Sequence, residues 1–281
     1  MARKTKQMIS SAVLLVFFII VVIIVLFPIY YLIIGSLQPS REIFRTGMKL
    51  VYDSEIMGFN NYKLLIDYRD GVYFSWLKNS ILIAGLFTVC ALFFSSLVGY
   101  GLGVYDFKYK NIIFTLVLVV MMIPLEILML PLYKLTVQLK IINTYAGVIL
   151  PFMVSPIAIF FFRQYSSGIS RDFLDAGRID GCTEIGIYFK IMVPLMKPAF
   201  GAMTILLAMQ NWNSFVWPLI VLRDNEMFTL PIGLSSLISP YGNNFDVMIA
   251  GAVIAIAPII ILFLFNQRFF IAGLTSGGIK G

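Results

Sequence analysis

A short polar stretch, RDFLDAGRIDG from Arg171 to Gly181, carries the residues best suited to specific contacts with another molecule. It lies between two long hydrophobic runs, and its five charged side chains surround the small pair Ala176 and Gly177. On a helix, two such residues leave the backbone nearly bare, so that another surface can approach closely while the charges orient it. The alternative is a solvated amphipathic loop without a partner.

The same stretch has the signals of a short helix followed by a second one. Ser170 can cap the first helix, Asp172 is favourable in its positively polarised first turn, and Gly181 is well placed to end it. A second helical run, TEIGIYFKIMV, follows Cys182 until Pro194 stops or bends it. We therefore predict a helix, a turn and another helix.

A second polar set, in AMQNWNSFVWPL, interrupts an apolar run and offers groups that can bind a sugar. Gln210, Asn213 and Trp217 recur at helical spacing, and Ser214 lies beside them. One helix face would then combine amides for sugar hydroxyls with an aromatic ring for the apolar face of a sugar. The alternative is that the amides join neighbouring helices and the tryptophans mark a membrane interface.

One carboxylate, Glu126, lies well inside an apolar run, between Pro124 and Pro131. An acidic residue within a membrane span is a functional candidate, here as a gate or a proton site. The alternative is that it lies near the outer end of its span and reaches water.

Several kinds of catalytic chemistry are excluded by the residue types. The chain has no histidine, which excludes His-based zinc sites, Ser-His catalysis and His proton relays. Cys90 and Cys182 form neither a disulfide framework nor a CxxC pair. No GxxxxGK[ST] loop is present to bind nucleotide phosphates. We expect no catalytic residue and no metal site. A membrane-embedded hydrolase is disfavoured, because the sequence has no recognisable Ser-Lys or paired-aspartate arrangement.

The elements that must hold these residues are membrane spans. The chain of 281 residues is 60% hydrophobic and only 12% charged, with a mean hydropathy of +0.92, far from the ~25% charged residues of soluble domains. Continuous apolar runs near the ~20 residues that cross a bilayer predict helices rather than a barrel. We expect a single all-α membrane domain over 1–281, with spans at about 11–34, 80–100, 111–130, 145–162, 199–222 and 247–270.

The first of these runs follows Arg3, Lys4 and Lys6, as a signal peptide would, but it is too long and lacks a convincing cleavage site. We interpret it as a retained span. The net charge of +7 comes from basic residues scattered through loops, which argues against a nucleic-acid-binding face and instead sets membrane orientation. We expect both termini and the polar stretch to lie in the cytoplasm. The basic residues that indicate this orientation are Lys108, Lys110, Arg163, Arg171, Arg178, Lys190 and Lys197.

The polar stretch resembles the EAA loop of ABC importer permeases, which has the form E-A-A, three residues, G, nine residues, I-x-L-P. The matching residues begin at Asp175, Ala176 and Gly177, continue at Gly181, and end with IMVP at Pro194. Asp175 stands where Glu is usual and Gly177 where the second Ala is usual. The first change shortens the reach of the carboxylate, and the second costs roughly 1 kcal/mol of helix propensity.

Other phrases resemble the carbohydrate-uptake branch of these permeases, which includes the smaller permease subunit of the maltose importer. They are NSILIAG, WNSFVWPLIVLRD, TLPIGL and FIAGLTSGGIKG. GYGLGVYDFK, MMIPLEILMLPLYKLTV, ILPFMVSPIAIFFFRQY and SSLISPYGNN resemble the permeases of arabino-oligosaccharide importers of bacilli.

The resemblance implies a type I ABC importer permease with six transmembrane helices in a bacterial cell membrane. Its partners would be a second homologous permease, a dimer of ATPase subunits holding ATP and Mg, an extracellular solute-binding protein and a sugar, most simply an oligosaccharide. This chain would bind no cofactor and would work by alternating access. The rival is an ion-coupled secondary transporter that needs no ATPase.

The resemblance also implies sites. A cytoplasmic coupling loop at about 166–196 would contact the ATPase through these residues: Asp175, Ala176, Gly177, Arg178, Asp180, Gly181, Ile191 and Pro194. The loop between the last two spans would contact the solute-binding protein, unless it is an ordinary surface turn, through these residues: Ser239, Pro240, Tyr241, Gly242, Asn243 and Asn244. The tail GLTSGGIKG would reach the ATPase dimer, unless its glycines mark terminal disorder.

Overall fold

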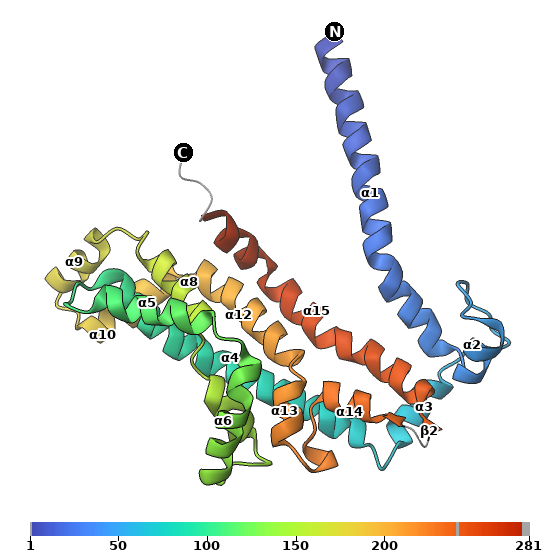
Figure 1. Cartoon of the computed structure of the whole chain (residues 1–281). Helices are drawn as coiled ribbons and strands as arrows, with labels where there is room; N and C mark the ends of the chain where they lie inside the picture. The colour runs from blue at the N-terminus through green and yellow to red at the C-terminus, as the bar shows by residue number, and fades with distance from the viewer. Residues whose placement is uncertain (1, 240–241, 277–281) are drawn as a thin grey trace. The chain divides into compact units, whose positions relative to one another are not determined.

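The computed structural model describes residues 2–239 and 242–276, and it is mostly helical, as the sequence predicts (Figure 1). The α-helices are α1 (Ala2–Leu37), α2 (Ser40–Thr46), α3 (Asn60–Asp67), α4 (Val72–Val104), α5 (Lys110–Met121), α6 (Leu125–Gln138), α7 (Tyr145–Ile149), α8 (Pro156–Ser166), α9 (Asp172–Ile179), α10 (Glu184–Ile187), α11 (Val193–Leu195), α12 (Lys197–Trp212), α13 (Val216–Val221), α14 (Leu230–Ser236) and α15 (Phe245–Ser276). Short 3₁₀-helices cover Leu150–Phe152 and Asn225–Met227, and a π-helix, η2, covers Tyr188–Met192. Strands β1 (Ile238–Ser239) and β2 (Gly242–Asn243) form an antiparallel pair.

The helices account for three to six membrane spans by length and composition, counted over the described residues. Single helices suffice at Ser11–Leu37, in α4, and at Phe245–Phe269. Three further candidates are bent pairs: α5 with α6 at 99°, Tyr145–Phe152 with α8 at 46°, and Glu184–Leu195 with α12 at 77°. Six spans result if each bent pair is one span, which is the predicted number. The last pair then covers Glu184–Trp212, whereas the fifth span was expected at 199–222 and the coupling loop at about 166–196.

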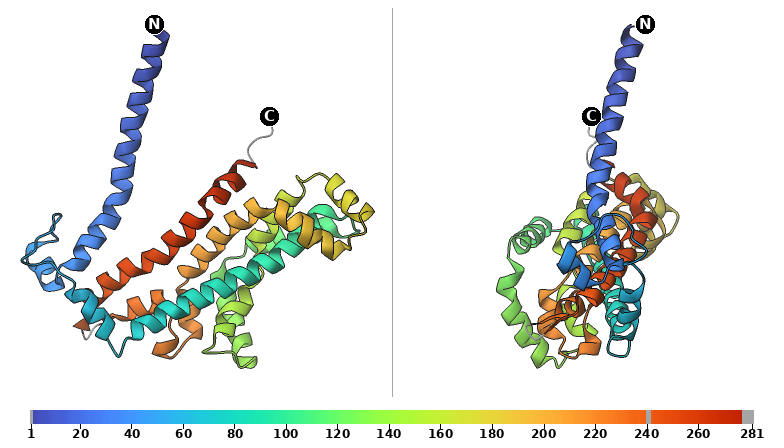
Figure 2. Two further views of the ribbon diagram at one scale, coloured as in Figure 1. Left: turned by 180° about the vertical axis from the view of Figure 1, so that it is seen from behind. Right: turned by 90° about the vertical axis from the view of Figure 1, so that its right-hand side faces the viewer.

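Three of the predicted runs are interrupted, which corrects their expected courses. The run expected at 145–162 breaks between Phe152 and Pro156. The run expected at 111–130 breaks before Pro124, the N-cap of α6, and α6 leaves the direction of α5 steeply in the right-hand view of Figure 2. Proline disfavours helix in the residue before it, so this position is a natural break. The run expected at 199–222 ends its helix at Trp212, and α13 starts only at Val216.

The chain divides into two compact units. One unit consists of Met1–Tyr73 and Leu234–Ile256, and the other of Phe74–Gly233 and Ala257–Gly281. Helices α4 and α15 contribute residues to both units, so the predicted single domain stays a prediction.

Within the first unit, the segment after α1 is fastened to the start of α15. The hydroxyl of Ser40 donates to Asp246 over 2.9 Å. The buried side chain of Asn61 donates to the carbonyls of Ser36 and Gln38, at 2.9 and 3.0 Å. These bonds satisfy backbone groups exposed where α1 ends.

Within the second unit, α4 packs closely against α8, and α9 and α10 lie at one end of α4 (Figure 1). A Cβ added at Gly99 would lie 2.6 Å from Phe162 Cβ and 2.8 Å from the Ile159 carbonyl oxygen. Only a residue without a side chain permits this approach. The core around this contact contains these fully buried side chains: Phe162, Ile187, Met192, Met196 and Leu207.

Candidate functional site

The polar helix pair (residues 170–196) begins with α9, whose start and end follow the sequence signals. Ser170 lies one residue before the N-cap, Arg171, and its hydroxyl oxygen accepts a bond from the Asp172 amide at 3.2 Å. At the other end, Gly181 has φ +77°, the left-handed conformation that glycine adopts without strain.

This glycine completes a Schellman turn. The Gly181 amide donates to the Arg178 carbonyl at 3.0 Å, and the Cys182 amide donates to the Gly177 carbonyl at 2.9 Å. Both bonds satisfy carbonyls that the end of a helix leaves without partners. The prediction that Gly181 ends the first helix is confirmed.

The second helical run begins at Thr183, whose side chain accepts a bond from the Gly186 amide at 3.1 Å. It then passes from α10 into η2 and α11, and ends at Leu195, one residue beyond Pro194. Proline has no amide to donate within the helix, and the π-helical segment ends two residues before Pro194. The run turns at Met196 into α12.

The small pair in α9 divides between two faces, which corrects the expectation that both residues leave the helix open to a partner. Ala176 is exposed, but Gly177 is buried. A Cβ added at Gly177 would lie 2.6 Å from Ile191 Cδ1 and 3.1 Å from Ile187 Cγ1. Gly177 therefore allows α9 to pack against the second helical run of its own chain.

The outer face of the polar helix pair is largely apolar, a feature that the sequence analysis missed. Phe173 and Ile179 are 49% and 86% exposed, with Ala176 between them on the same face of α9. Ile185 and Phe189 add two more exposed apolar side chains from the second run. The signal in the sequence was the recurrence of apolar residues three apart in an otherwise charged segment.

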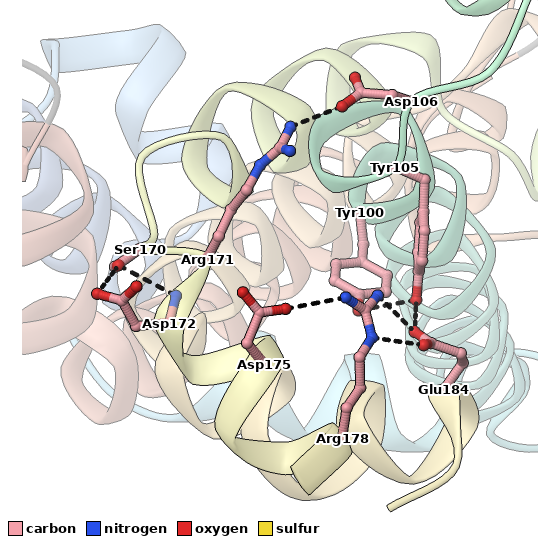
Figure 3. A network of polar contacts seen from close by, with 9 residues as sticks. All are labelled: Tyr100, Tyr105, Asp106, Ser170, Arg171, Asp172, Asp175, Arg178 and Glu184. Carbon is pink, nitrogen blue, oxygen red and sulfur yellow. Dashed lines mark hydrogen bonds and ion pairs between the residues drawn. The ribbon is translucent and has the colours of Figure 1, made fainter.

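The charged residues of α9 are paired within the chain. Arg178 lies between two carboxylates, with Nε 2.8 Å from Glu184 Oε1 and one Nη 3.1 Å from Asp175 Oδ1 (Figure 3). The hydroxyl of Tyr105 donates to the other oxygen of Glu184. Burial, together with the acceptor at Glu184, raises the pKa of Tyr105 above its usual range. The Arg178–Glu184 pair thus links the two helical runs, whereas the Arg178–Asp175 pair lies within α9.

A second polar contact joins α9 to the turn between α4 and α5. One Nη of Arg171 lies 2.8 Å from Asp106 Oδ2 (Figure 3). Lys110 Nζ lies 3.2 Å from the other oxygen. The bonds from Arg171 and Lys110 lower the pKa of Asp106 below its usual value of 3.8. The start of α9 is therefore tied to the α4–α5 turn.

A buried bond anchors the second helical run to α4. The hydroxyls of Tyr188, in η2, and Ser96, in α4, are 2.7 Å apart. Tyr188 also packs against the ring of Tyr100, with centroids 5.2 Å apart. The polar helix pair thus contacts α4 through a buried bond and, beyond the helix end, through Tyr105.

The second predicted site, in the fifth run, is arranged differently from the prediction. Because α12 ends at Trp212, Gln210, Asn213 and Trp217 do not share one continuous helix face. Asn213 is the C-cap of α12, and its side-chain amide nitrogen, Nδ2, donates to the Met209 carbonyl at 2.9 Å.

The break after α12 nevertheless opens onto a cavity, the α12 cavity, of about 150 Å³. Gln210, Ser214 and Trp217 all line it, whereas Asn213 does not. The other lining residues are Phe87, Leu125, Phe152, Val154, Ser155, Pro156 and Asn211. The structure brings three of the four predicted residues together and adds Asn211 and Ser155.

The remaining candidates are less informative. Glu126 is exposed in the first turn of α6, where the positive end of the helix dipole favours a carboxylate. Of the residues expected to contact a binding protein, Ser239 pairs with Gly242 in the β1–β2 ladder. Pro240 and Tyr241 lie outside the described residues, as do residues 277–281 of the tail.

The chain is similar to proteins of membrane transport systems. Residues 91–275 match the model of the family described as binding-protein-dependent transport system inner membrane component. The chain is 62% identical, over 91% of each sequence, to the arabinooligosaccharides transport system permease protein AraQ of Bacillus subtilis (strain 168). It is 33% identical, also over 91% of each, to the lactose transport system permease protein LacG of Rhizobium radiobacter.

A solved structure has a similar fold. It is the crystal structure of a bacterial ABC transporter involved in the import of the acidic polysaccharide alginate. The match has a TM-score of 0.81 and covers 94% of this chain and 98% of that one, at 22% sequence identity.

Proposed function

Since the chain belongs to the family of binding-protein-dependent transport system inner membrane components, we propose that it is the permease of an importer for neutral oligosaccharides, arabino-oligosaccharides foremost. The family expected from the EAA-like loop is confirmed, and the chain is a multi-pass transport subunit, not an enzyme. The 62% identity to a permease protein named for arabinooligosaccharides carries the choice of substrate. The basic loops support a cytoplasmic location for both termini.

The family description and the absence of a phosphate-binding loop in the sequence support the partners that we propose. A binding protein outside the cell delivers the sugar, a second permease completes the pathway, and two ATPase subunits with ATP and Mg supply the energy. The permease pair alternates between inward-open and outward-open states. The ATPase can drive this change only to the extent that it binds the two states with different free energies.

The polar helix pair is the coupling element in this proposal. Its exposed apolar residues, Phe173, Ala176 and Ile179, fit a groove on an ATPase subunit, and Asp180 is exposed beside them. Asp175 and Arg178 form an ion pair with each other. In this proposal they shape the surface and do not form ion pairs with the ATPase subunit. Three members of the predicted set act from within: Gly177 and Ile191 in the contact between the two helical runs, and Gly181 in the turn. Pro194 is exposed near the end of the second run.

On the other side of the membrane, the turn between β1 and β2 is a contact for the solute-binding protein. The ladder pairs Ile238 with Asn243 and Ser239 with Gly242, which fixes the two ends of this connection. Asn244 continues the fastening, because its amide donates to the Leu237 carbonyl at 3.0 Å.

Uptake of radiolabelled arabinotriose tests the function. Cells that lack this chain but retain its partners should take up the sugar only when the chain is restored. Uptake should persist with an uncoupler while ATP is maintained, and it should stop when ATP is depleted. Collapse of uptake by the uncoupler alone would favour an ion-coupled secondary transporter, and unchanged uptake without the chain would refute the proposal.

A further inference from the structure

The α12 cavity contains a buried hydrogen-bond donor without a partner. Trp217 lines the cavity, is 3% exposed, and its Nε1–H has no hydrogen-bond acceptor among the described residues. Its ring is held edge-on against Phe152, with centroids 5.6 Å apart and an interplanar angle of 89°. The indole is therefore oriented by packing, and its Nε1 makes no hydrogen bond within the described part of the chain.

A buried N–H donor without an acceptor, such as that of Trp217, points to a ligand that supplies the acceptor. A buried tryptophan N–H normally finds a partner, because leaving it without one forfeits the bond that water would provide. The other buried indole with a described bond illustrates the norm, since Trp76 Nε1 donates to the Asn225 carbonyl at 2.8 Å. Nε1 is covered by its neighbours in this state, so Trp217 fits a site in which a bound molecule brings the acceptor after the side chains over Nε1 have moved aside.

The residues around Trp217 define the chemistry of that molecule. Gln210, Asn211, Ser214 and Ser155 offer uncharged donors and acceptors, and Phe87 and Phe152 offer apolar surface. None of the residues that line the cavity is charged. A neutral ligand with hydroxyls at its rim and a C–H face, that is, a sugar ring, matches this lining.

The size of the cavity limits the ligand to one ring. Its 150 Å³ corresponds to about five water molecules at ~30 Å³ each, below the ~300 Å³ at which pockets for drug-sized ligands begin. Resting on the proposed function, we propose that the α12 cavity is a subsite for one neutral sugar ring of the transported oligosaccharide, with Trp217 Nε1 donating to a sugar oxygen. The remaining rings then lie outside this cavity along the pathway.

Substitution of Trp217 by phenylalanine tests the assignment, because Trp217→Phe removes the N–H and keeps an aromatic ring. The matched control is Trp212→Phe, since Trp212 is also buried but does not line the cavity. Both variants are assembled with their partner permease, ATPase and binding protein in proteoliposomes. The rate of import is measured with arabinotriose and with arabinotrioses that each lack one hydroxyl. The binding protein is preloaded with each sugar and saturating, so that its own preference among the sugars does not affect the measured rates.

The wild-type transporter should import at least one deoxy-sugar about 2- to 10-fold more slowly than arabinotriose, as expected for the loss of one neutral hydrogen bond. Trp217→Phe should abolish that preference, and Trp212→Phe should retain it. A purely structural role would instead slow the import of all the sugars equally. Equal slowing, or retention of the wild-type preference by Trp217→Phe, would overturn the subsite.

Two further results keep the outcome decisive. Should Trp217→Phe fail to assemble, judged by ATP hydrolysis stimulated by the binding protein, the same ratio is measured in Gln210→Ala, which must then lose a preference for one hydroxyl. A wild-type complex that imports arabinotriose without any preference among the deoxy-sugars refutes the subsite alone. A wild-type complex that imports no neutral oligosaccharide refutes the proposed function itself.

Discussion

Replacement of Gly177 by valine should detach α9 from the second helical run and uncouple transport. An added Cβ would already lie 2.6 Å from Ile191 Cδ1, whereas carbon atoms in favourable contact are about 3.5–4.0 Å apart. The overlap is therefore roughly 1 Å. The atom met is the end of a flexible side chain, so alanine can be accommodated, but the two further methyl groups of valine cannot.

The expected magnitude follows from the cost of overpacking. Extra methyl groups in a packed interior cost ~1–3 kcal/mol, and each 1.4 kcal/mol is about tenfold in an equilibrium. The fraction of molecules in which the polar helix pair is open should rise roughly 5- to 150-fold. Ala176→Val is the matched control, since it places the same side chain on the exposed face of the same helix.

Cys182 supplies the assay, because it follows the turn that ends α9 and is partly buried. With Cys90 replaced by alanine, the rate of maleimide labelling in membranes reports only Cys182. Gly177→Val should accelerate labelling and reduce sugar uptake, and Ala176→Val should leave labelling unchanged. Wild-type labelling and uptake in Gly177→Val would refute the internal packing role of this glycine.

Three other substitutions test separate features of the same region. Ala176→Arg should abolish sugar uptake and the stimulation of ATP hydrolysis by the binding protein, with unchanged amounts of the chain in the membrane; normal uptake would remove this residue from the ATPase contact. Ser96→Ala should cost ~1–3 kcal/mol because it leaves the buried Tyr188 hydroxyl without its partner, and the melting temperature should recover partly when Tyr188→Phe is added; a simple sum of the two losses would contradict the bond. Gly181→Ala should cost ~1–2 kcal/mol at a φ of +77°, seen as faster labelling of Cys182, and an unchanged rate would show that α9 ends without this glycine.

Local features of the polar helix pair were predictable from the sequence because they depend on neighbouring residues. The role of Gly181 follows from the need for a left-handed residue after a helix, and Pro194 marks a disturbed helical stretch. The role of Gly177 was not predictable, because it depends on the position of Ile191, which belongs to another helical segment.

The charge network was out of reach for the same reason. Arg171 meets Asp106 across 65 positions of sequence, and Tyr105 meets Glu184 across 79. No periodicity links such residues, and only the packing of α9 against the end of α4 brings them together. In the fifth run, the apolar composition predicted a span, but it did not show that the helix ends at Trp212 and leaves a cavity.

The bend at Met196 allows a small change in the tilt of α12 to move the far end of that helix by a larger distance. The helices before and after this bend meet at 77°, and the bend is held by bonds from the Met196 amide to Met192 and from the Phe200 amide to Met196. From Lys197 to Gln210 the helix is about 20 Å long at ~1.5 Å per residue. A tilt of about 10° at the bend would move the amide of Gln210 by roughly 3.5 Å on this length, enough to admit or expel a sugar hydroxyl.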